Sequence, residues 1–536
     1  MSLPNSLPEQ LPTFFNIGDA CTRQWAQSFR ADTPAIIVHD STQGESSLTF
    51  RQLNEQTDRL AAFLIAREMQ KSERVLIRLP NCLEYPVAFL GVLKAGGIAV
   101  PASPQLSPDE LEFLLKDSGA SVAVLSESDL RLLLPRLARV PDLRQVIVKG
   151  AGAPDADLLA DGIALHAMHD VLLHPVSDSA MPSTLANDPA YLVYTSGTTG
   201  YPKGVLHAHR ALLGRLPAAA DWFDYRGDDD RILHTGKFNW TYVLGTALMD
   251  PLYQGKSVVV HEGDATPETW IELIRRYECT IFIGVPTLYR QILQKTVFHA
   301  GEVPTLRHCM CAGEHLSDEV QLGWQARFGA PVYEAIGMSE CSYYLSQSRA
   351  FPVRPGSAGR PQRGHQVALL NRQLQPVGDE EEGMLCIHES DPGLFLGYWQ
   401  REDENRASRQ GAYFLTGDYA RRDADGYFWF LGRKDDLINS FGYRISPHEV
   451  ERVLKTFAGV ADCVVVPETV GDDKTLIVAC IIRETGSKMS EADVLAFCAE
   501  HLARYKMPRK VYFLADFPRT RNGKVLRRGV LATVLE

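Results

Sequence analysis

The sequence has no segment typical of an exported or membrane-spanning protein. Its N-terminal stretch, MSLPNSLPEQLPTFFNIGDA, lacks the basic start and the long apolar run of a secretory signal peptide. A run of about 18 apolar residues is absent as well, so no transmembrane helix is predicted. We therefore expect a cytoplasmic protein without stable membrane insertion.

Basic residues are in the minority. The chain has 55 Lys and Arg residues against 66 Asp and Glu residues, which gives a formal net charge of −11. This balance argues against a general nucleic-acid or membrane binder. An anionic ligand would have to be held by local basic groups.

Ten cysteines are present, but none has the CxxC spacing of a zinc or redox site. Cys309 and Cys311 stand one residue apart, which is a poor zinc pattern. His207 and His209 flank a single alanine, and no third ligand accompanies them. We interpret the cysteines as buried, reduced thiols of a cytosolic protein and the two histidines as structural residues.

The length of 536 residues exceeds what a single hydrophobic core holds, so two or more domains are expected. Helix and strand signals alternate through the first part of the chain. Capping boxes at Thr49–Gln52 and Ser107–Glu110 predict helix starts, and the apolar run 75–79 predicts a strand. This alternation predicts an α/β fold with parallel strands.

The sequence pattern changes beyond about residue 350. Signals for short strands and Gly/Asp turns dominate there and predict a β-rich subdomain. A further capping box at Ser446–Glu449 starts a small α+β unit. We predict a large N-terminal domain over 1–432, made of two α/β subdomains and the β-rich subdomain. A hinge at 433–436 and a small, mobile C-terminal α+β domain over 437–536 complete the predicted fold.

Residues 194–204, YTSGTTGYPKG, carry the strongest functional signal. Their glycines let the backbone approach a ligand, their hydroxyls supply donors, and Lys203 adds a positive charge. This combination suits a polyphosphate, although the GxxxxGK[ST] order of a Walker P-loop is absent. A glycine-rich loop alone fits a polar surface turn equally well, so the prediction depends on the rest of the chain.

Five further segments follow in order: AGEH at 312–315, YEAIGMSE at 333–340, LTGD at 415–418, FLGRKDD at 430–436 and PRTRNGK at 518–524. Together with the loop, this series resembles the adenylate-forming superfamily. That superfamily includes acyl-CoA synthetases, adenylation domains of peptide synthetases and firefly-type luciferases. The resemblance spans roughly residues 45–530.

The resemblance implies an ATP site. The phosphates of ATP would be held by the loop residues Thr195, Ser196, Gly197, Thr198, Thr199, Gly200 and Lys203. Glu340 would bind Mg²⁺, a hard cation that prefers carboxylates and phosphates, while Ser339 would contact the α-phosphate. Gly313, Glu314 and Tyr333 would flank the adenine, and Asp418 and Arg433 would bind the ribose. Taken alone, the Ser339–Glu340 pair would be a helix-cap feature, Asp418 would be a turn aspartate and Arg433 would be a surface arginine.

The same resemblance gives the C-terminal domain two tasks. Lys524, otherwise a solvated lysine, would be the catalytic lysine of adenylation and would neutralise charge as pyrophosphate leaves. A rotation about Asp435 would then present another face, where Gly442 lines a tunnel for the pantetheine arm. No carrier-protein domain follows Lys524, so coenzyme A is the expected acceptor.

The carboxylate pocket is predicted from a group rich in aromatic residues: Lys237, Phe238, Trp240, Tyr242, Val285, Gly337 and Tyr343. Such residues would form a flat, apolar slot, although core packing explains individual members equally well. Residues 234–252 resemble the benzoate and medium-chain branch of the acyl-CoA ligases. An aromatic, alicyclic or medium-chain acid is therefore favoured.

The sequence thus predicts an ATP-dependent carboxylate–CoA ligase that uses ATP, Mg²⁺ and coenzyme A. One alternative is an adenylating enzyme that loads a carrier protein. Another is a non-catalytic acyl-adenylate-binding relative, against which Lys203, Glu340, Asp418 and Lys524 count. No nucleic-acid partner is expected, and a homodimer is left open.

Overall fold

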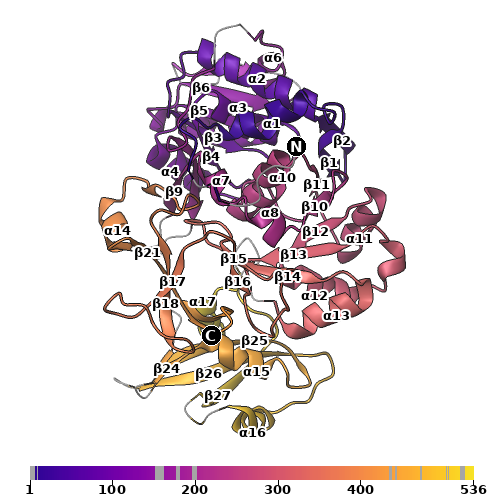
Figure 1. Ribbon diagram of the computed structural model, residues 1–536, viewed down its shortest axis with the longest axis vertical. Coiled ribbons are helices and arrows are strands. Elements are labelled where there is room, and N and C mark those ends of the chain that lie inside the picture. The colour runs from indigo at the N-terminus through magenta and orange to yellow at the C-terminus, as the bar shows by residue number, and fades with distance from the viewer. Residues whose placement is uncertain are drawn as a thin grey trace. The chain divides into compact units, whose positions relative to one another are not determined.

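The computed structural model describes residues 7–8, 10–150, 162–176, 181–195, 202–314, 316–433, 438–440, 443–470, 474–502, 504, 506–519 and 525–535. The chain forms two compact units, whose elements are labelled in Figure 1. Unit 1 comprises Met1–Pro352, Pro361–His365 and Glu389–Ala407, and unit 2 comprises Val353–Arg360, Gln366–His388 and Ser408–Glu536. The chain passes from unit 2 back to unit 1 within β16 (Arg360–Pro361).

The described residues of unit 1 form two sheets. The first runs in the order β19-β9-β8-β4-β3-β5-β6-β7. Its strands are β3 (Arg74–Arg78), β4 (Ile98–Pro101), β5 (Val122–Ser126), β6 (Gln145–Lys149), β7 (Ala164–Ala167), β8 (Pro189–Thr195), β9 (Lys203–Ala208) and β19 (Gly397–Tyr398). The pairs from β4–β8 through β6–β7 are parallel, whereas β9 is antiparallel to both β8 and β19.

The second sheet includes the order β15-β14-β13-β12-β10-β11-β1-β2. Its strands are β1 (Pro34–Asp40), β2 (Gly44–Thr49), β10 (Arg231–His234), β11 (Ser257–Glu262), β12 (Ile281–Gly284), β13 (His308–Ala312), β14 (Val332–Ile336) and β15 (Leu345–Ser346). The central pairs, from β1–β11 to β13–β14, are all parallel. Short apolar runs such as Ile281–Gly284 are fully buried, as expected for parallel strands covered on both faces.

The helices of unit 1 connect these strands. The longer ones are α1 (Ile17–Ala26), α2 (Phe50–Ala66), α3 (Glu84–Lys94), α4 (Pro108–Ser118), α5 (Glu127–Leu133), α11 (Pro267–Arg276), α12 (Pro286–Lys295) and α13 (Asp318–Phe328). Shorter segments are η1 (Leu134–Arg139), α6 (Met168–Val171), α7 (Ala211–Gly214), α8 (Ala218–Asp221), α9 (Thr241–Val243), the π-helical η3 (Leu244–Met249), α10 (Asp250–Tyr253), η4 (Ala300–Glu302) and α14 (Glu402–Ala407).

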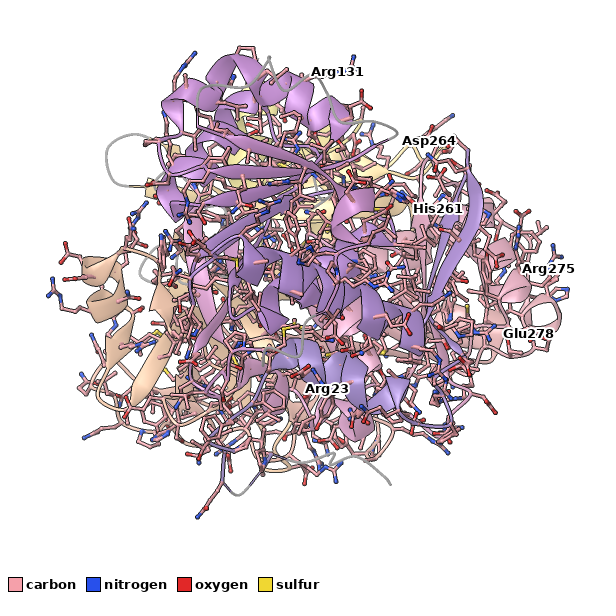
Figure 2. All side chains as sticks on the ribbon, turned by 90° about the horizontal axis from the view of Figure 1, so that it is seen from above. Arg23, Arg131, His261, Asp264, Arg275 and Glu278 are labelled. Atoms are coloured by element: carbon pink, nitrogen blue, oxygen red, sulfur yellow. The ribbon has the colours of Figure 1, made fainter. Side chains whose placement is uncertain are left out.

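Local signals set the starts of two of these helices. The predicted capping boxes Thr49–Gln52 and Ser107–Glu110 are both formed, so each helix begins at its predicted cap. Charged side chains remain exposed on the helices, among them Arg23 on α1, Arg131 on α5 and Arg275 on α11, which Figure 2 labels. The predicted α/β fold is confirmed.

Unit 2 contains the strands β17 (Val367–Leu370), β18 (Glu382–His388), β20 (Arg409–Gln410), β21 (Tyr413–Arg422), β22 (Phe428–Arg433), β23 (Ile438–Ser440), β24 (Tyr443–Ile445), β25 (Val460–Val470), β26 (Lys474–Arg483) and β27 (Lys510–Leu514). Its helices are α15 (Pro447–Leu454), α16 (Glu491–His501), α17 (Arg527–Val530) and α18 (Ala532–Leu535). One sheet has the order β17-β18-β21-β20 with β22 on β21, and another the order β25-β26-β27.

The predicted capping box at the start of α15 forms only in half. Ser446 accepts a hydrogen bond from the amide of Glu449, as predicted. The Glu449 carboxylate instead accepts from Lys506 Nζ at 2.6 Å, because an ammonium is a stronger partner than the cap amide. The predicted division of the chain at 433–436 stays a prediction, since residues 434–437 lie outside the described part.

All ten cysteines are buried free thiols, as predicted. Burial raises the pKa of Cys279 to about 12 and raises that of Cys311 far above its ordinary value. Across the described ranges, the helices are too short or too polar to cross a bilayer.

Candidate active site

Four neighbouring parallel strands of unit 1 end at the same edge of the second sheet. Because β10, β12, β13 and β14 pair in parallel in that order, the residues that follow them lie side by side. In open α/β sheets, this carboxyl edge is where ligands bind. The segments that follow the strands contain most of the predicted pocket and adenine residues: Lys237, Phe238, Trp240 and Tyr242 after β10, Val285 after β12, Gly313 and Glu314 after β13, and Gly337 after β14.

The predicted phosphate loop connects β8 to β9 in the other sheet. Thr195 ends β8 and lies opposite Lys203, the first residue of β9. Ser196, Gly197, Thr198, Thr199 and Gly200 fall outside the described residues. Lys203 Nζ lies 3.7 Å from the centre of the Tyr398 ring and 3.4 Å from Glu404 Oε2. The lysine thus has an aromatic face and a carboxylate as its partners.

The Ser339–Glu340 turn is held by three hydrogen bonds. Tyr398 Oη donates to Glu340 Oε1 at 2.8 Å, and the amide of Phe395 donates to the Glu340 carbonyl at 2.8 Å. His207 Nε2 lies 2.7 Å from the Ser339 carbonyl oxygen. Glu340 is only 7% exposed. Strands β9 and β19 therefore fix both the backbone and the carboxylate of this turn.

The tautomer of His207 follows from its surroundings. Burial lowers its pKa to about 3, so the ring is neutral at physiological pH. A carbonyl oxygen can only accept, so the proton is on Nε2. His207 Nδ1 has no hydrogen-bond partner within the described part of the chain. The ring also stacks on Tyr191 at a centroid distance of 4.7 Å, which fixes its plane.

Two of the three predicted adenine residues, Gly313 and Glu314, directly follow β13. Gly313 has a φ of +91°, which favours glycine, and a Cβ atom placed on it would lie 3.6 Å from the Trp240 ring. Glu314 Oε2 accepts a hydrogen bond from Thr287 Oγ1 at 2.6 Å. Tyr333, within β14, stacks on His308 with ring centroids 5.0 Å apart. Tyr333 pairs with Met310 near the start of β14, so the structure places it apart from Gly313 and Glu314, which follow the end of β13.

Some predicted pocket residues join an aromatic cluster, which we define as Trp222, Tyr242 and Tyr343. The Trp222 ring centroid lies 4.9 Å from that of Tyr343 and 6.3 Å from that of Tyr242. Trp240 packs edge-on against Tyr242 at 5.2 Å. The Tyr242 and Tyr343 hydroxyls are buried and have no hydrogen-bond partner among the described residues. This cluster belongs to the hydrophobic core and is largely apolar, with the two tyrosine hydroxyls as its polar points.

The backbone around the cluster leaves no room for larger residues. A Cβ atom on Gly337 would lie 2.4 Å from the Tyr343 amide nitrogen. A Cβ atom on Gly245, in the π-helical η3, would lie 2.7 Å from Tyr343 Oη. His234 Nε2 and Thr246 Oγ1 lie 2.9 Å apart, and Thr246 donates to the Tyr242 carbonyl at 2.7 Å. Glycines and a buried hydrogen-bond chain thus position the two tyrosines.

Two other predicted pocket residues do not join the aromatic cluster. Phe238 is buried and stacks on Tyr85 at 5.3 Å, so it packs in the core and not in the aromatic cluster. Lys237 Nζ pairs with Glu262 Oε2 at 2.7 Å. Residues 238–240 form a turn, and the alternation of aromatic residues there is therefore not that of a strand.

The predicted ribose residues lie together in unit 2. Asp418 and Arg433 are opposite each other across β21 and β22, and Arg433 Nε lies 3.4 Å from Asp418 Oδ1. Gly417, with a φ of +77°, turns the chain immediately before the aspartate. Asp435, Gly442 and Lys524 lie outside the described residues.

A separate cavity in unit 1 is too small for a substrate. The centre of a water molecule can occupy about 10 Å³ of it, between Arg215, Tyr225, Asp250 and Gln254. Space of that size holds about one water. None of the residues that line it was predicted as part of the site.

The sequence motifs do not point to Tyr398 or Trp222, and they give His207 no role beyond a structural one. Tyr398 belongs to a two-residue strand, and Trp222 follows the short helix α8, so neither has a periodic signal around it. The HAH spacing at 207–209 bears only on metal binding. Its position directly after the phosphate loop was the available signal.

The chain is similar to known proteins over most of its length. Residues 22–399 match the family model of the AMP-binding enzyme, and residues 449–524 match that of the AMP-binding enzyme C-terminal domain. The benzoate–CoA ligase of Thauera aromatica is 32% identical, and the match covers 86% of this chain and 85% of that protein. The 3-hydroxybenzoate–CoA ligase of Aromatoleum sp. (strain CIB) is 30% identical over 92% of both chains.

A solved structure extends the likeness to the fold. The anthranilate CoA ligase AuaEII, in complex with anthranoyl-AMP, matches with a TM-score of 0.85 and 28% identity. The match covers 98% of this chain and 99% of that one. The resemblance drawn from the sequence motifs is confirmed, and the chain belongs to the AMP-binding enzyme family.

Proposed function

We propose that this protein activates an aromatic carboxylic acid with ATP and transfers it to coenzyme A. The protein is an AMP-forming acid–CoA ligase, and the observation that carries this assignment is the match of both family models along the chain. A carboxylate oxygen attacks the α-phosphorus of ATP, which forms acyl-AMP and releases pyrophosphate. The thiol of coenzyme A then attacks the acyl carbon, and AMP leaves as the C–S bond forms.

The phosphate-binding groups belong to unit 1. Lys203 and the hydroxyls of Thr195 and the following loop would hold the triphosphate, and Ser339 would contact its α-phosphate. The donor set near Glu340 fits Mg²⁺, because a buried carboxylate lies beside a hydroxyl residue and the ligand itself brings phosphate oxygens. Bound Mg²⁺ would neutralise phosphate charge, while Glu340 would orient the complex. Gly313, Glu314 and Tyr333 would flank the adenine.

The other residues to which we give a role in this reaction belong to unit 2. Asp418 can accept hydrogen bonds from both ribose hydroxyls, and the adjacent Arg433 would contact the same sugar. Lys524 would stabilise the charge that develops during adenylation. Asp435 would be the hinge of a C-terminal domain over 437–536, and Gly442 would line the path of the thiol.

Two observations support an aromatic acid over an alicyclic or medium-chain one. The aromatic cluster offers flat apolar surfaces, and two of its members, Tyr242 and Tyr343, come from the segments that follow β10 and β14. The relatives named above are ligases of benzoate, 3-hydroxybenzoate and anthranilate. The Tyr242 and Tyr343 hydroxyls have no partner among the described residues, and they would favour an acid whose ring carries a hydroxyl or amino group, because a buried polar group gains from a partner. A cytoplasmic location completes the proposal.

Exchange of labelled pyrophosphate into ATP tests the first half-reaction. The panel should contain benzoate, hydroxybenzoates, 2-aminobenzoate, cyclohexanecarboxylate, octanoate and acetate. We expect the aromatic acids to give the highest kcat/KM and acetate the lowest. Equal exchange with every acid would contradict the substrate class, and no exchange with any acid would favour a non-catalytic relative.

Thioester formation separates the ligase from an enzyme that loads a carrier protein. The best acid is supplied with ATP and either coenzyme A or a phosphopantetheinylated carrier protein. We expect turnover with coenzyme A. Turnover with the carrier alone would overturn coenzyme A as the acceptor.

A further inference from the structure

Tyr398 contacts two predicted phosphate-site residues through different parts of its side chain. The face of its ring lies 3.7 Å from Lys203 Nζ, and its hydroxyl donates to Glu340 Oε1 at 2.8 Å. The two contacted residues come from separate segments, because Lys203 begins β9 and Glu340 follows β14. One side chain therefore sets the spacing between a cation and an anion of the site.

The backbone of Tyr398 is itself well anchored. Tyr398 lies opposite Val205 in the antiparallel pair of β19 and β9. Its amide donates to Asn405 Oδ1 at 2.6 Å, and Asn405 Nδ2 donates back to its carbonyl at 2.9 Å. The residue is 7% exposed. A side chain fixed in this way can hold its partners in place and does not simply follow them.

The two contacts have different physical origins. An ammonium over the face of a tyrosine ring is attracted by the ring quadrupole, and this attraction does not need the hydroxyl. The hydrogen bond to Glu340 is assisted by the charge of the carboxylate and fixes the carboxylate plane. Outer groups that orient a metal-binding carboxylate commonly control metal affinity. A substitution that removes only the hydroxyl therefore separates the two effects.

We propose that Tyr398 is a positioning residue for adenylation. Its ring holds Lys203 and its hydroxyl holds Glu340, so that both face one Mg²⁺–triphosphate at a fixed spacing. This inference rests on the proposed roles of Lys203 and Glu340. Tyr398 itself makes no contact with the reacting atoms in this scheme.

The test uses two substitutions and two binding measurements on the full chain. Tyr398→Phe keeps the ring and removes the hydroxyl, whereas Tyr398→Leu removes both. ATP affinity is measured by calorimetry in EDTA, and Mn²⁺ affinity of the enzyme–ATP complex is measured by electron paramagnetic resonance. Circular dichroism and a thermal melt establish that each variant is folded.

The two variants should differ in a defined way. Tyr398→Phe should bind metal-free ATP within about twofold of wild type, because the cation–π contact is kept. Its Mn²⁺ affinity should fall about tenfold or more, as for other lost outer-shell partners. Tyr398→Leu should also weaken metal-free ATP binding, by roughly three- to tenfold. A raised Mg²⁺ concentration should restore the pyrophosphate exchange rate of Tyr398→Phe but not that of Tyr398→Leu.

Tyr277→Phe is the matched control. Tyr277 Oη donates to Glu45 Oε2 at 2.9 Å, so the change removes a tyrosine–glutamate hydrogen bond of similar length outside the predicted site. We expect both affinities to stay at the wild-type values. Equal Mn²⁺ loss in Tyr277→Phe and Tyr398→Phe would overturn the inference, and so would unchanged Mn²⁺ binding in Tyr398→Phe.

Failure of the inference can be told apart from failure of the proposed function. Wild-type exchange with the acid panel and loss of Mn²⁺ binding in Glu340→Gln establish the function independently of Tyr398. If those hold while Tyr398→Phe binds Mn²⁺ normally, only the positioning role is wrong. If Tyr398→Leu does not fold, Tyr398→Phe alone still decides between the two results.

Discussion

His207 Nε2 donates a hydrogen bond to the main-chain carbonyl of Ser339 over 2.7 Å. The contact joins β9, which begins at Lys203, to the turn that carries Glu340. Because the histidine is buried and neutral, this is a permanent structural link and not a proton-transfer group. It ties the strand after the phosphate loop to the predicted metal-binding turn.

Replacing His207 with Phe should impair adenylation, because the Ser339 carbonyl loses its buried donor at a cost of about 1–3 kcal/mol. His207→Gln should recover much of the activity, since its amide nitrogen can occupy a position close to that of Nε2. Pyrophosphate exchange at saturating substrate measures the effect. Equal activity of the Phe and Gln variants would show that the hydrogen bond is unimportant.

Buried neutral histidines should make unit 1 sensitive to acid. Burial lowers the pKa of His209 to about 4, with Asp188 opposing the shift, and lowers that of His234 to about 3. An unfolded histidine has a pKa near 6.5, so the unfolded state binds more protons below that value. Each such residue therefore adds to the free energy of unfolding above pH 6.5. As the pH falls below that value, this contribution declines at a rate of up to about 1.4 kcal/mol per pH unit.

Urea unfolding at pH 7.5 and 5.5 measures this dependence. The informative variant is His209→Asn, whose side-chain oxygen can still accept from the Ile17 amide, as His209 Nδ1 does at 3.1 Å. Proton uptake on unfolding near pH 5.5 should fall by about one in this variant. An unaltered pH dependence would mean that His209 is already protonated in the folded protein.

Glu451 should be essential to the stability of unit 2. Burial favours the neutral acid, but Arg527 and His448 outweigh it and hold the pKa of Glu451 well below its ordinary range. Arg527 contacts both carboxylate oxygens, and the Val465 amide donates to Oε1 at 2.7 Å. Glu451→Gln should cost about 3–5 kcal/mol, because it leaves a largely buried arginine without its counter-charge.

The pH dependence of this contribution has a definite sign. With a folded pKa below the unfolded one, the stability is complete above about pH 4.5 and is lost as the pH falls. Thermal melts of wild type and Glu451→Gln between pH 7 and 3 should therefore converge toward the acidic end. The double variant Glu451→Gln/Arg527→Met should be more stable than Glu451→Gln alone, and a less stable double variant would contradict the pairing.

Features that depend on neighbouring residues could be predicted from the sequence, whereas contacts between distant segments could not. Capping boxes and buried runs are local, so α2, α4 and the strands of the α/β fold could be predicted from nearby residues. The motif series indicated Asp418 and Arg433 separately, and β21 and β22 pair them. Tyr398 could not be found in this way, because its contact with Glu340 joins residues 58 positions apart through a two-residue strand. The stacking of Phe238 on Tyr85 could not be predicted either, since burial against a distant residue has no distinct local pattern.

Lys524→Ala should abolish most acyl-adenylate formation and leave the fold intact. A preorganised charge at the transition state is worth about 2.7–4 kcal/mol, which corresponds to a loss of roughly a hundred- to a thousandfold in kcat. Thioester formation from synthetic acyl-AMP and coenzyme A should fall far less, because the lysine is expected to be turned away in that step. An equal fall in both half-reactions would contradict the two-face mechanism.

Gly442→Leu should have the opposite effect. If the pantetheine arm passes close to the backbone here, a leucine side chain would obstruct the thiol without touching the ATP-binding groups. Pyrophosphate exchange should persist at the wild-type rate while acyl-CoA output collapses, and Gly442→Ala should show a smaller loss because its side chain is shorter. Acyl-CoA is measured by chromatography alongside the exchange assay on the same preparation. Wild-type output from Gly442→Leu would mean that the thiol enters by another route.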